Sequence, residues 1–550
     1  MEKITVGAII TKPGSSTKYK TGGWSTYRPV LVVETPPCNN ACPAGVDARG
    51  YIRLIQDKRY DEALELVREK IPLPGVVGRV CHHPCEEKCY RGKLDAPVSI
   101  CTLKRFIADC VAEKHHTTPS KIQNKKNGKV AIIGSGPAGL SAAYKLAKIG
   151  YSVTIFEALP VEGGMLRVGI PDYRLPKNVL KNEIDAIKAL GVEIKLNTPV
   201  KDTIALKEQY NAVFIAAGAQ KNSKLNIPGE ELDGVIHGLD FLQSVNLGKP
   251  TSIWKNVAII GGGNVAIDVA RSVIRTGAQS HILYRRTREE MPAIKEDIDE
   301  AEREGVHINY LVSPKRILGS NKVTGIECIR MSLGEPDESG RRRPVPIEGS
   351  EFVIDVDTVI PAVGQYPDFS FTKGRLKTEN QMLIVDPKTF STNQPGIFAG
   401  GDIVTGPATV IEAIAAGMKA ATCIDRYIAG DKLECEESEA PPLVEFKEMN
   451  LSMVETKNRT GFGKLSIDER KSNYKEVNHG FTEQEALEEA ERCLSCGCCR
   501  ECELCYIYCP DIAIKMGEKG MNADYDYCKG CGICANECRC GVIKMKLGVK

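Results

Sequence analysis

Cysteines are concentrated near the carboxyl end of this 550-residue chain, where twelve of its twenty-two fall between Cys493 and Cys540. Two runs there have the spacing Cys-x2-Cys-x2-Cys-x3-Cys, and a proline follows the first run. Thiolates at this spacing bind [4Fe–4S] clusters, and the fourth cysteine of each run ligates the cluster of the other run. Zinc is the weaker interpretation, because zinc sites usually combine two separated ligand pairs. We therefore assign one cluster to Cys499, Cys502, Cys505 and Cys538, and the other to Cys528, Cys531, Cys534 and Cys509.

A glycine-rich turn follows a short buried strand that we predict over residues 129–133. The turn reads Gly-Ser-Gly-Pro-Ala-Gly, and its glycines let the backbone approach a pyrophosphate at the N-terminus of the next helix. A second predicted strand, over residues 152–156, ends at an acid, where a carboxylate binds the ribose of an adenine dinucleotide. Strand, glycines, helix and acid in this order predict a dinucleotide site. Its candidate residues are Gly134, Gly136, Pro137, Ala138, Gly139 and Glu157.

A second turn of this kind follows a strand predicted over residues 257–260 and has the pattern G-x-G-x-x-A. The next predicted strand, over residues 281–284, ends on two arginines instead of an acid. Arginine at that position can pair with the 2′-phosphate of NADP, whereas an acid selects NAD. The alternative is a solvated arginine face, which would leave NAD possible. The candidate NADP-binding residues are Gly261, Gly263, Asn264, Val265, Arg285 and Arg286.

The segment of residues 163–171 lies where related flavoproteins place a redox-active cysteine pair, but it contains no cysteine, so dithiol chemistry is not expected. Together with residues 173–176 and 284–293, it resembles the small subunit of NADPH-dependent glutamate synthase and its relatives, over about residues 35–430. Residues 396–402 resemble the second flavin signature of flavoproteins with two dinucleotide domains. The resemblance implies that the first site binds FAD and that the NADP domain is inserted into the FAD domain. It adds Gly164, Met165, Leu166, Gly169, Ile170, Gly401, Asp402 and Thr409 as candidate FAD-binding residues.

In that family a helical domain before the flavin domain carries two further [4Fe–4S] clusters. The corresponding cysteines are Cys38, Cys42, Cys81, Cys85, Cys89 and Cys101. The family's upstream Cys-x2-Cys-Gly is missing here, but the same pattern occurs at residues 493–497. We therefore predict that the carboxy-terminal segment folds back, giving one cluster on Cys493, Cys496, Cys38 and Cys89, and another on Cys42, Cys81, Cys85 and a nearby fourth ligand. Cys101 is the candidate for this ligand, although relatives use a carboxamide or carboxylate a few residues later, where this chain has Leu103, Lys104 and Arg105. The alternative is a single amino-terminal cluster, with the later pair idle or holding a structural metal.

Composition restricts the class of protein. The net charge is +2, which does not indicate binding to nucleic acid or to an anionic membrane. The start of the chain lacks the features of a signal peptide, and no apolar run reaches membrane-spanning length. Many cysteines in such a chain indicate metal ligation in a reducing compartment. We expect a cytoplasmic protein of an anaerobe.

The expected fold is a multidomain α/β protein with two Rossmann-like domains, a helical iron–sulfur domain and a bacterial-type 2[4Fe–4S] ferredoxin domain. The expected order is a strap over residues 1–34, the helical domain over 35–120 and the first part of the FAD domain over 121–250. These are followed by the NADP domain over 251–365, the second part of the FAD domain over 366–430, a linker over 431–492 and the ferredoxin domain over 493–550.

The strap, with Trp24, Tyr27 and Arg28, resembles the amino-terminal strap of the delta subunit of 2-oxoacid:ferredoxin oxidoreductases, and the cysteine run over residues 525–538 is similar to that subunit. These residue types often anchor interfaces, although the strap could also pack only on its own chain. The resemblance implies an NADP-reducing subunit of a pyruvate- or 2-oxoglutarate-type complex, with thiamine diphosphate-dependent subunits as partners. The alternatives are a glutamate synthase small subunit, a free-standing reductase of free ferredoxin, and a scaffold with vestigial nucleotide sites. FAD links hydride transfer to single-electron transfer, so no acid–base residue is predicted.

Overall fold

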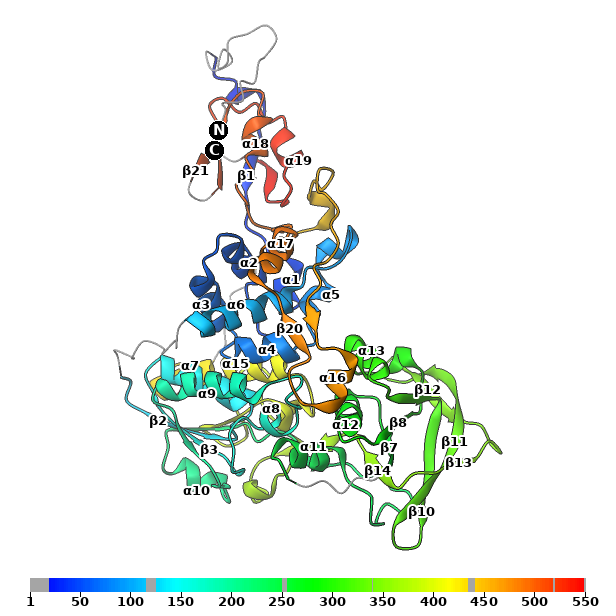
Figure 1. Ribbon diagram of the computed structural model, residues 1–550. Coiled ribbons are helices and arrows are strands. Elements are labelled where there is room, and N and C mark those ends of the chain that lie inside the picture. Colours follow the sequence, from blue (N-terminus) through cyan, green and yellow to red (C-terminus); the bar gives the residue numbers. More distant parts are fainter. Residues whose placement is uncertain are drawn as a thin grey trace.

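The computed structural model describes residues 19–114, 125–249, 255–338, 340–433, 441–517 and 520–548. The molecule is elongated, with the cysteine-rich carboxy-terminal module at one end, the helical domain in the middle and both nucleotide-binding domains at the other end (Figure 1). Residues 1–18, more than half of the predicted strap, lie outside the described residues. Within the described ranges, no helix is long and apolar enough to cross a membrane.

A parallel five-stranded sheet, in the order β18-β5-β2-β3-β4, forms the core of the first nucleotide domain. Its strands are β2 (Lys129–Ile133), β3 (Ser152–Phe156), β4 (Glu193–Lys195), β5 (Ala212–Ile215) and β18 (Ile397–Ala399). Because β18 follows the second nucleotide domain in the chain, this domain is split, as the sequence predicts. Helix α15 (Val410–Ala429) packs closely on α7 (Pro137–Lys148), since a Cβ atom at Gly417 would lie 2.1 Å from the Ala138 carbonyl oxygen.

The inserted domain has a parallel sheet in the order β14-β7-β8-β9. Its strands are β7 (Asn256–Ile260), β8 (Gln279–Tyr284), β9 (His307–Tyr310) and β14 (Thr358–Pro361), and helices α11 (Gly238–Asn246), α12 (Asn264–Ile274) and α13 (Lys295–Arg303) belong to it. An antiparallel sheet precedes β14 and consists of β10 (Val312–Gly319), β11 (Val323–Pro336), β12 (Arg342–Pro346) and β13 (Phe352–Ile354). Two Rossmann-like domains are therefore present, as the sequence predicts.

The helical domain contains α1 (Pro37–Asn40), α2 (Ala48–Gln56), α3 (Tyr60–Arg68), α4 (Pro74–Val80), α5 (Pro84–Glu87) and α6 (Ile100–Lys114). Its core buries Tyr51, Ile55 and Leu103 completely. The start of α4 docks on α9 (Lys177–Ala189) of the FAD domain, where the Glu183 carboxylate accepts hydrogen bonds from the backbone N–H groups of Gly75 and Val76 at 2.6 and 3.0 Å. Helix α4 therefore connects the flavin domain with the cysteines that follow it.

The carboxy-terminal module combines both ends of the chain. Strand β1 (Tyr27–Leu31) pairs antiparallel with β23 (Ile543–Leu547), beside the hairpin β21 (Ile514–Gly517)–β22 (Gly520–Ala523) and the short helices α18 (Leu504–Ile507) and α19 (Ile533–Asn536). The Arg28 guanidinium donates a hydrogen bond to the Cys528 carbonyl oxygen at 3.3 Å. The described part of the strap thus packs on its own chain, and Arg28 is used within it.

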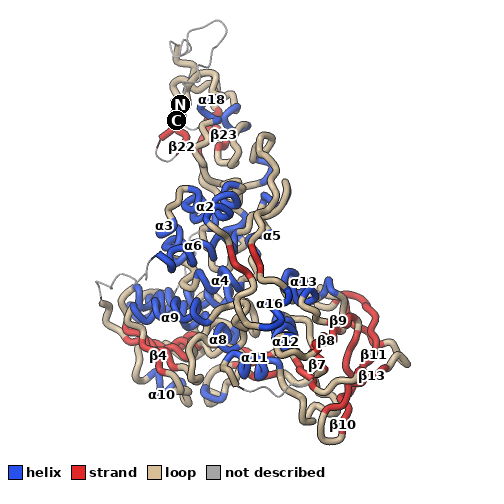
Figure 2. Tube along the Cα trace, viewed as in Figure 1, coloured by secondary structure: helices blue, strands red, loops and turns tan. Residues whose placement is uncertain are grey.

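Residues 441–492 form more structure than the predicted linker, because they contain β19 (Gly463–Lys464), α16 (Ile467–Ser472), β20 (Asn478–Gly480) and α17 (Glu483–Glu491). This segment begins beside the module, where the Asn450 N–H group donates a hydrogen bond to the Cys538 carbonyl oxygen at 3.1 Å. It then runs along the helical domain to α16 at the inserted domain and returns through β20 and α17 (Figure 1), and Figure 2 shows its helices and strands from the same side. Lys464 and Arg470 both form ion pairs with Glu300 of the inserted domain. The segment therefore ties three parts of the molecule together.

Candidate functional site

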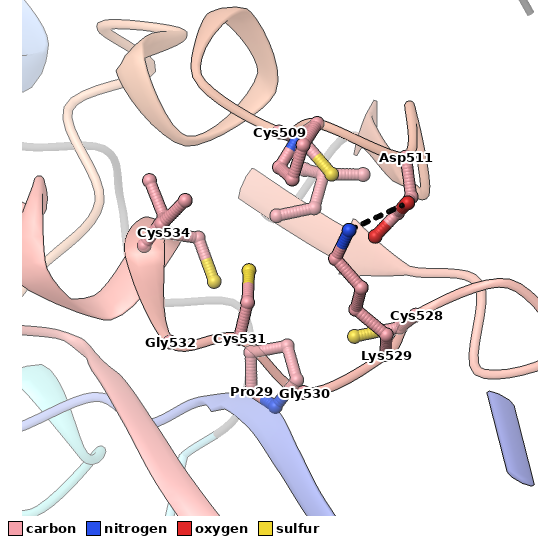
Figure 3. A pocket seen from close by; sticks show the side chains of 12 residues that line it. Pro29, Cys509, Asp511, Cys528, Lys529, Gly530, Cys531, Gly532 and Cys534 are labelled. Carbon is pink, nitrogen blue, oxygen red and sulfur yellow. Dashed lines mark ion pairs between the residues drawn. The ribbon is translucent and has the colours of Figure 1, made fainter. Parts of the chain in front are cut away.

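The carboxy-terminal module contains two cysteine-lined pockets. One is lined by Cys509, Cys528, Cys531 and Cys534, and Figure 3 shows their side chains around a common space. The other is lined by Cys499, Cys502, Cys505 and Cys538. Each pocket brings together one predicted ligand set, including the fourth cysteine from the other run.

The thiols are spread around these pockets instead of converging on one point. Among the described residues, no group of three or more His, Cys, Asp or Glu side chains is placed to hold a single metal ion. A [4Fe–4S] cube differs from a single ion because each thiolate binds a different iron, so its ligands surround a volume. The arrangement in both pockets fits such a cube.

A third group of thiols joins the two ends of the chain. Burial, together with the neighbouring thiols of Cys493, Cys89 and Cys496, raises the pKa of Cys38 well above its usual range. Burial and the nearby Cys89 also raise the pKa of Cys493, to about 11. Four thiols from both ends of the sequence are therefore neighbours, in the combination that the fold-back hypothesis requires.

The side chain of Arg492 links the cysteine pair Cys493 and Cys496 to the helical domain. This side chain is 1% exposed and forms ion pairs with Glu489 at 2.7 Å and Asp95 at 2.9 Å. The Arg91 guanidinium also donates a hydrogen bond to the Arg492 carbonyl oxygen at 3.3 Å. Because Arg91 follows Cys89 by two residues, these contacts hold the end of α17 beside Cys89. The sequence analysis missed the contact with Asp95, which is far from Arg492 in the chain.

A fourth group consists of Cys42, Cys81, Cys85 and Cys101, close to the buried Lys104 on α6. The Cys101 thiol lies 3.4 Å from the Val77 carbonyl oxygen, and its interaction with Cys81 lowers the pKa of the Cys81 thiol. Burial opposes a charge on Lys104, but the neighbouring thiols of this group raise its pKa above the usual range. A buried cation requires nearby negative charge, which cluster thiolates would supply. This group therefore fits a [4Fe–4S] cluster, and the sequence analysis missed the part of Lys104.

The predicted FAD loop lies at the N-terminus of α7. A Cβ atom at Gly139 would lie 2.0 Å from the Gly134 carbonyl oxygen, so the tight turn needs glycine there. A Cβ atom at Gly136, the N-cap residue, would meet no heavy atom within 4 Å, which leaves open space in front of the helix. The Glu157 carboxylate is 4% exposed and accepts hydrogen bonds from the backbone N–H and hydroxyl groups of Ser135 at 2.9 and 2.6 Å. The acid thus shapes the loop, and the open space fits a pyrophosphate.

The other predicted FAD residues converge on the same helix N-terminus. A Cβ atom at Gly164, which precedes α8 (Met165–Val168), would lie 2.9 Å from the Gly136 Cα atom, and one at Gly401 would lie 3.1 Å from the Ala138 Cβ atom. Burial raises the pKa of the Asp402 carboxyl group to about 6. Also in this region are Leu166 in α8, Gly169 and Ile170 directly after it, and Thr409 as the N-cap of α15.

The predicted NADP residues lie at two places, the N-terminus of α12 and the end of β8. A Cβ atom at Gly263, the N-cap of α12, would meet no heavy atom within 4 Å, as at Gly136. Asn264 accepts a hydrogen bond from the Ile294 N–H group at 3.0 Å, so its side chain fixes the following loop. Arg285 is exposed after β8. Arg286 was expected to bind the 2′-phosphate of NADP, but it is 5% exposed and forms an ion pair with Asp337 at 2.6 Å. Its guanidinium is therefore already paired, with a residue next to the antiparallel sheet.

Arg174 connects the two nucleotide domains. Its guanidinium forms ion pairs with Asp268 of α12 at 2.7 Å and Asp297 of α13 at 3.0 Å. The neighbouring Tyr173 is 1% exposed, and the Arg275 guanidinium lies 3.9 Å from the centre of its ring. These buried charged contacts fix the inserted domain against the flavin domain.

Comparisons with known proteins agree with this architecture. The sequence model of the pyridine nucleotide-disulphide oxidoreductases matches residues 128–417, and that of dihydropyrimidine dehydrogenase domain II, 4Fe-4S cluster, matches residues 30–116. The chain is 45% identical to the NADP(+)-dependent formate dehydrogenase subunit beta of Moorella thermoacetica, covering 86% of this chain and 71% of that one. It is 41% identical to the NADPH-Fe(3+) oxidoreductase subunit beta of Geobacter sulfurreducens, covering 84% and 75%.

The glutamate synthase [NADPH] small chain of Escherichia coli is 34% identical to this chain and is covered over 89% of its length, with 72% of this chain aligned. The predicted resemblance is therefore confirmed, as are FAD, NADP and [4Fe–4S] clusters as the cofactors. The chain belongs to the pyridine nucleotide-disulphide oxidoreductase family, as a glutamate synthase small-subunit-like enzyme that carries iron–sulfur domains.

Proposed function

We propose that this chain transfers electrons between NADP(H) and a partner protein through FAD and four [4Fe–4S] clusters. The observation that carries the proposal is the order of the sites along the molecule. The inserted and FAD domains lie at one end, the helical domain with its two thiol groups lies between, and the two cysteine-lined pockets lie at the other end (Figure 1). Such an order supports stepwise electron transfer in either direction.

The cofactors, when bound, supply the electron chemistry, because FAD exchanges electrons in pairs with NADP(H) and singly with iron–sulfur clusters. The residues of the chain provide binding, orientation and charge. The N-termini of α7 and α12 present open space at Gly136 and Gly263 for phosphate groups. Arg285, exposed after β8, is the better candidate for the 2′-phosphate of NADP, because Arg286 is already paired.

We further propose that the chain is the NADP(H)-linked subunit of a larger enzyme. Two of its relatives are named as beta subunits, one of a formate dehydrogenase and one of an Fe(3+) oxidoreductase, which supports a multisubunit enzyme. A 2-oxoacid oxidoreductase with thiamine diphosphate-dependent subunits stays a second candidate. The observation that favours it is the strap, whose Trp24 and Tyr27 side chains are exposed on the module.

Anaerobic reduction of the isolated chain tests the electron-transfer proposal. Addition of NADPH should bleach the flavin absorbance and produce the electron paramagnetic resonance (EPR) signals of reduced clusters. A flavin that NADPH does not bleach would contradict it. Assays of the native complex with formate and with 2-oxo acids as electron donors for NADP+ reduction then decide between the two kinds of partner.

A further inference from the structure

Large apolar side chains are unusually exposed on the carboxy-terminal module. Among the described residues, seventeen large hydrophobic side chains are exposed, and ten of them lie within residues 19–33 and 493–548. These two segments are a small fraction of the described chain, so the exposure is concentrated on the module. Concentrated apolar exposure of this kind marks an interaction surface.

Several of these side chains are close in sequence to the ligands of one pocket, the one lined by Cys509, Cys528, Cys531 and Cys534. Tyr506, Ile507 and Tyr508 lie between Cys505 of the other pocket and Cys509, Ile512 follows Cys509 closely, and Ile533 lies between Cys531 and Cys534. Trp24 is 74% exposed and belongs to the turn in which the Gly22 N–H group donates a hydrogen bond to the Asp526 carbonyl oxygen at 2.8 Å, beside Cys528. We call Trp24, Tyr506, Ile507, Tyr508, Ile512 and Ile533 the rim surface.

The other pocket of the module has a different border. Its exposed ligand, Cys502, is flanked by the exposed charged residues Arg500, Glu501 and Glu503. Around the rim surface, by contrast, Lys529 forms an ion pair with Asp511 at 3.2 Å, and Lys20 forms one with Asp526 at 2.7 Å (Figure 3 for the first pair). Four of the charges near the rim surface are therefore paired within the chain.

The pocket with the rim surface is also the terminal one. The Arg53 guanidinium of α2 donates a hydrogen bond to the Cys499 carbonyl oxygen at 3.0 Å, which places the charged pocket toward the helical domain. In the rim pocket, Cys531 is itself exposed. An electron that enters the module from the helical domain therefore leaves it most directly at the rim surface.

The geometry points to the rim surface as the permanent docking site of a partner subunit that holds its own redox centre beneath an apolar, uncharged surface. Permanent interfaces are more apolar than transient ones, whereas charge steers short-lived redox encounters. When the partner is the acceptor, one electron per transfer leaves the cluster of the rim pocket, which is oxidised, and enters the partner's centre, which is reduced, while NADPH supplies electrons in pairs through FAD. When the partner is the donor, each electron moves the opposite way and NADP+ is reduced. Both directions rest on the proposed function, but the docking site does not.

The native complex, purified anaerobically through a tag on this chain, provides the test. We expect a subunit with a redox cofactor to stay bound in about 1 M NaCl, where surface charges are screened. Trp24→Asp and Tyr508→Asp should each weaken its binding by about thirtyfold, the size of a hot-spot loss. The matched controls are Met453→Asp, at a residue that is 73% exposed outside the rim surface, and Arg500→Glu at the charged pocket. Both should leave binding unchanged.

Each of the following results would overturn the proposal: release of the partner by salt, weakening by Arg500→Glu instead of the rim variants, a partner without a redox centre, or a chain that stays alone. Self-association lost in the rim variants would assign the surface to a second copy and also overturn it. The iron content per flavin should be equal in all variants, which shows that the module is intact. Flavin bleaching by NADPH in the isolated chain tests the proposed function separately, because docking does not affect that step.

Discussion

The charge of Lys104 should set the reduction potential of the cluster on Cys42, Cys81, Cys85 and Cys101. Lys104 is 3% exposed and is surrounded by these thiols, so its charge is poorly screened by water. If the two charges are taken as about 7 Å apart at an effective dielectric constant of about 20, their interaction is about 2.4 kcal/mol. Because about 2.3 kcal/mol per elementary charge corresponds to about 100 mV, removing the cation should lower the potential by about 100 mV.

Lys104→Met removes the charge and keeps most of the length of the side chain. An anaerobic redox titration monitored by EPR should show the signal of this cluster shifted to a more negative potential by about 100 mV. Lys104→Arg keeps the charge and should keep the potential near that of the unmodified chain. Lys114→Met, at an exposed position at the end of the same helix, should have no effect. An unchanged potential in Lys104→Met, at equal iron content per flavin, would refute the reasoning.

Three further predictions follow from particular contacts. Cys493→Ser should lower the iron content by about four irons per flavin, because one [4Fe–4S] cube is lost. Cys498→Ser should not change the iron content. An unchanged iron content in Cys493→Ser would leave the fold-back hypothesis without support. Arg285→Ala should raise the KM for NADPH by about tenfold or more and leave the KM for NADH nearly unchanged. Arg286→Ala should mainly lower the melting temperature. Equal effects of Arg285→Ala on both coenzymes would contradict this assignment. Arg174→Leu should lower the free energy of unfolding by about 3–5 kcal/mol in denaturant titrations, because it leaves the carboxylates of Asp268 and Asp297 without their cation. An unchanged unfolding midpoint would show that these ion pairs are dispensable.

The fold class was predictable because its signals are local. Glycines at fixed spacing after a buried strand leave few alternatives to a dinucleotide-binding turn, and the structure has the first such turn between β2 and α7. The return of the chain to the same sheet at β18 was also predictable, because the flavin signature there identifies the second half of the domain. The family and its cofactors followed from these motifs, and the comparisons confirm them.

Contacts between distant segments were not predictable in the same way. Arg285 and Arg286 look equivalent in the sequence, because both follow the same strand. Only Arg286 binds the carboxylate of Asp337, which lies 51 residues further along the chain. Residues 441–492 lack strong apolar periodicity, and their structure depends on ion pairs such as that of Lys464 with Glu300. Lys104 appears in the sequence as an ordinary helix residue, and only the packing of α6 near Cys42, Cys81 and Cys85 reveals its environment. In each case the decisive partners are remote in the chain.

The proposal that NADPH, FAD and four clusters form one electron-transfer series can be tested by rapid mixing. The isolated, anaerobic chain is mixed with NADPH, samples are frozen at successive times, and the reduced clusters are quantified by EPR. We expect the flavin to be bleached first and the cluster signals to appear afterwards, with about four reduced clusters per flavin after full chemical reduction. A bleached flavin with clusters that stay oxidised, or a total of about two reduced clusters per flavin, would disprove the series.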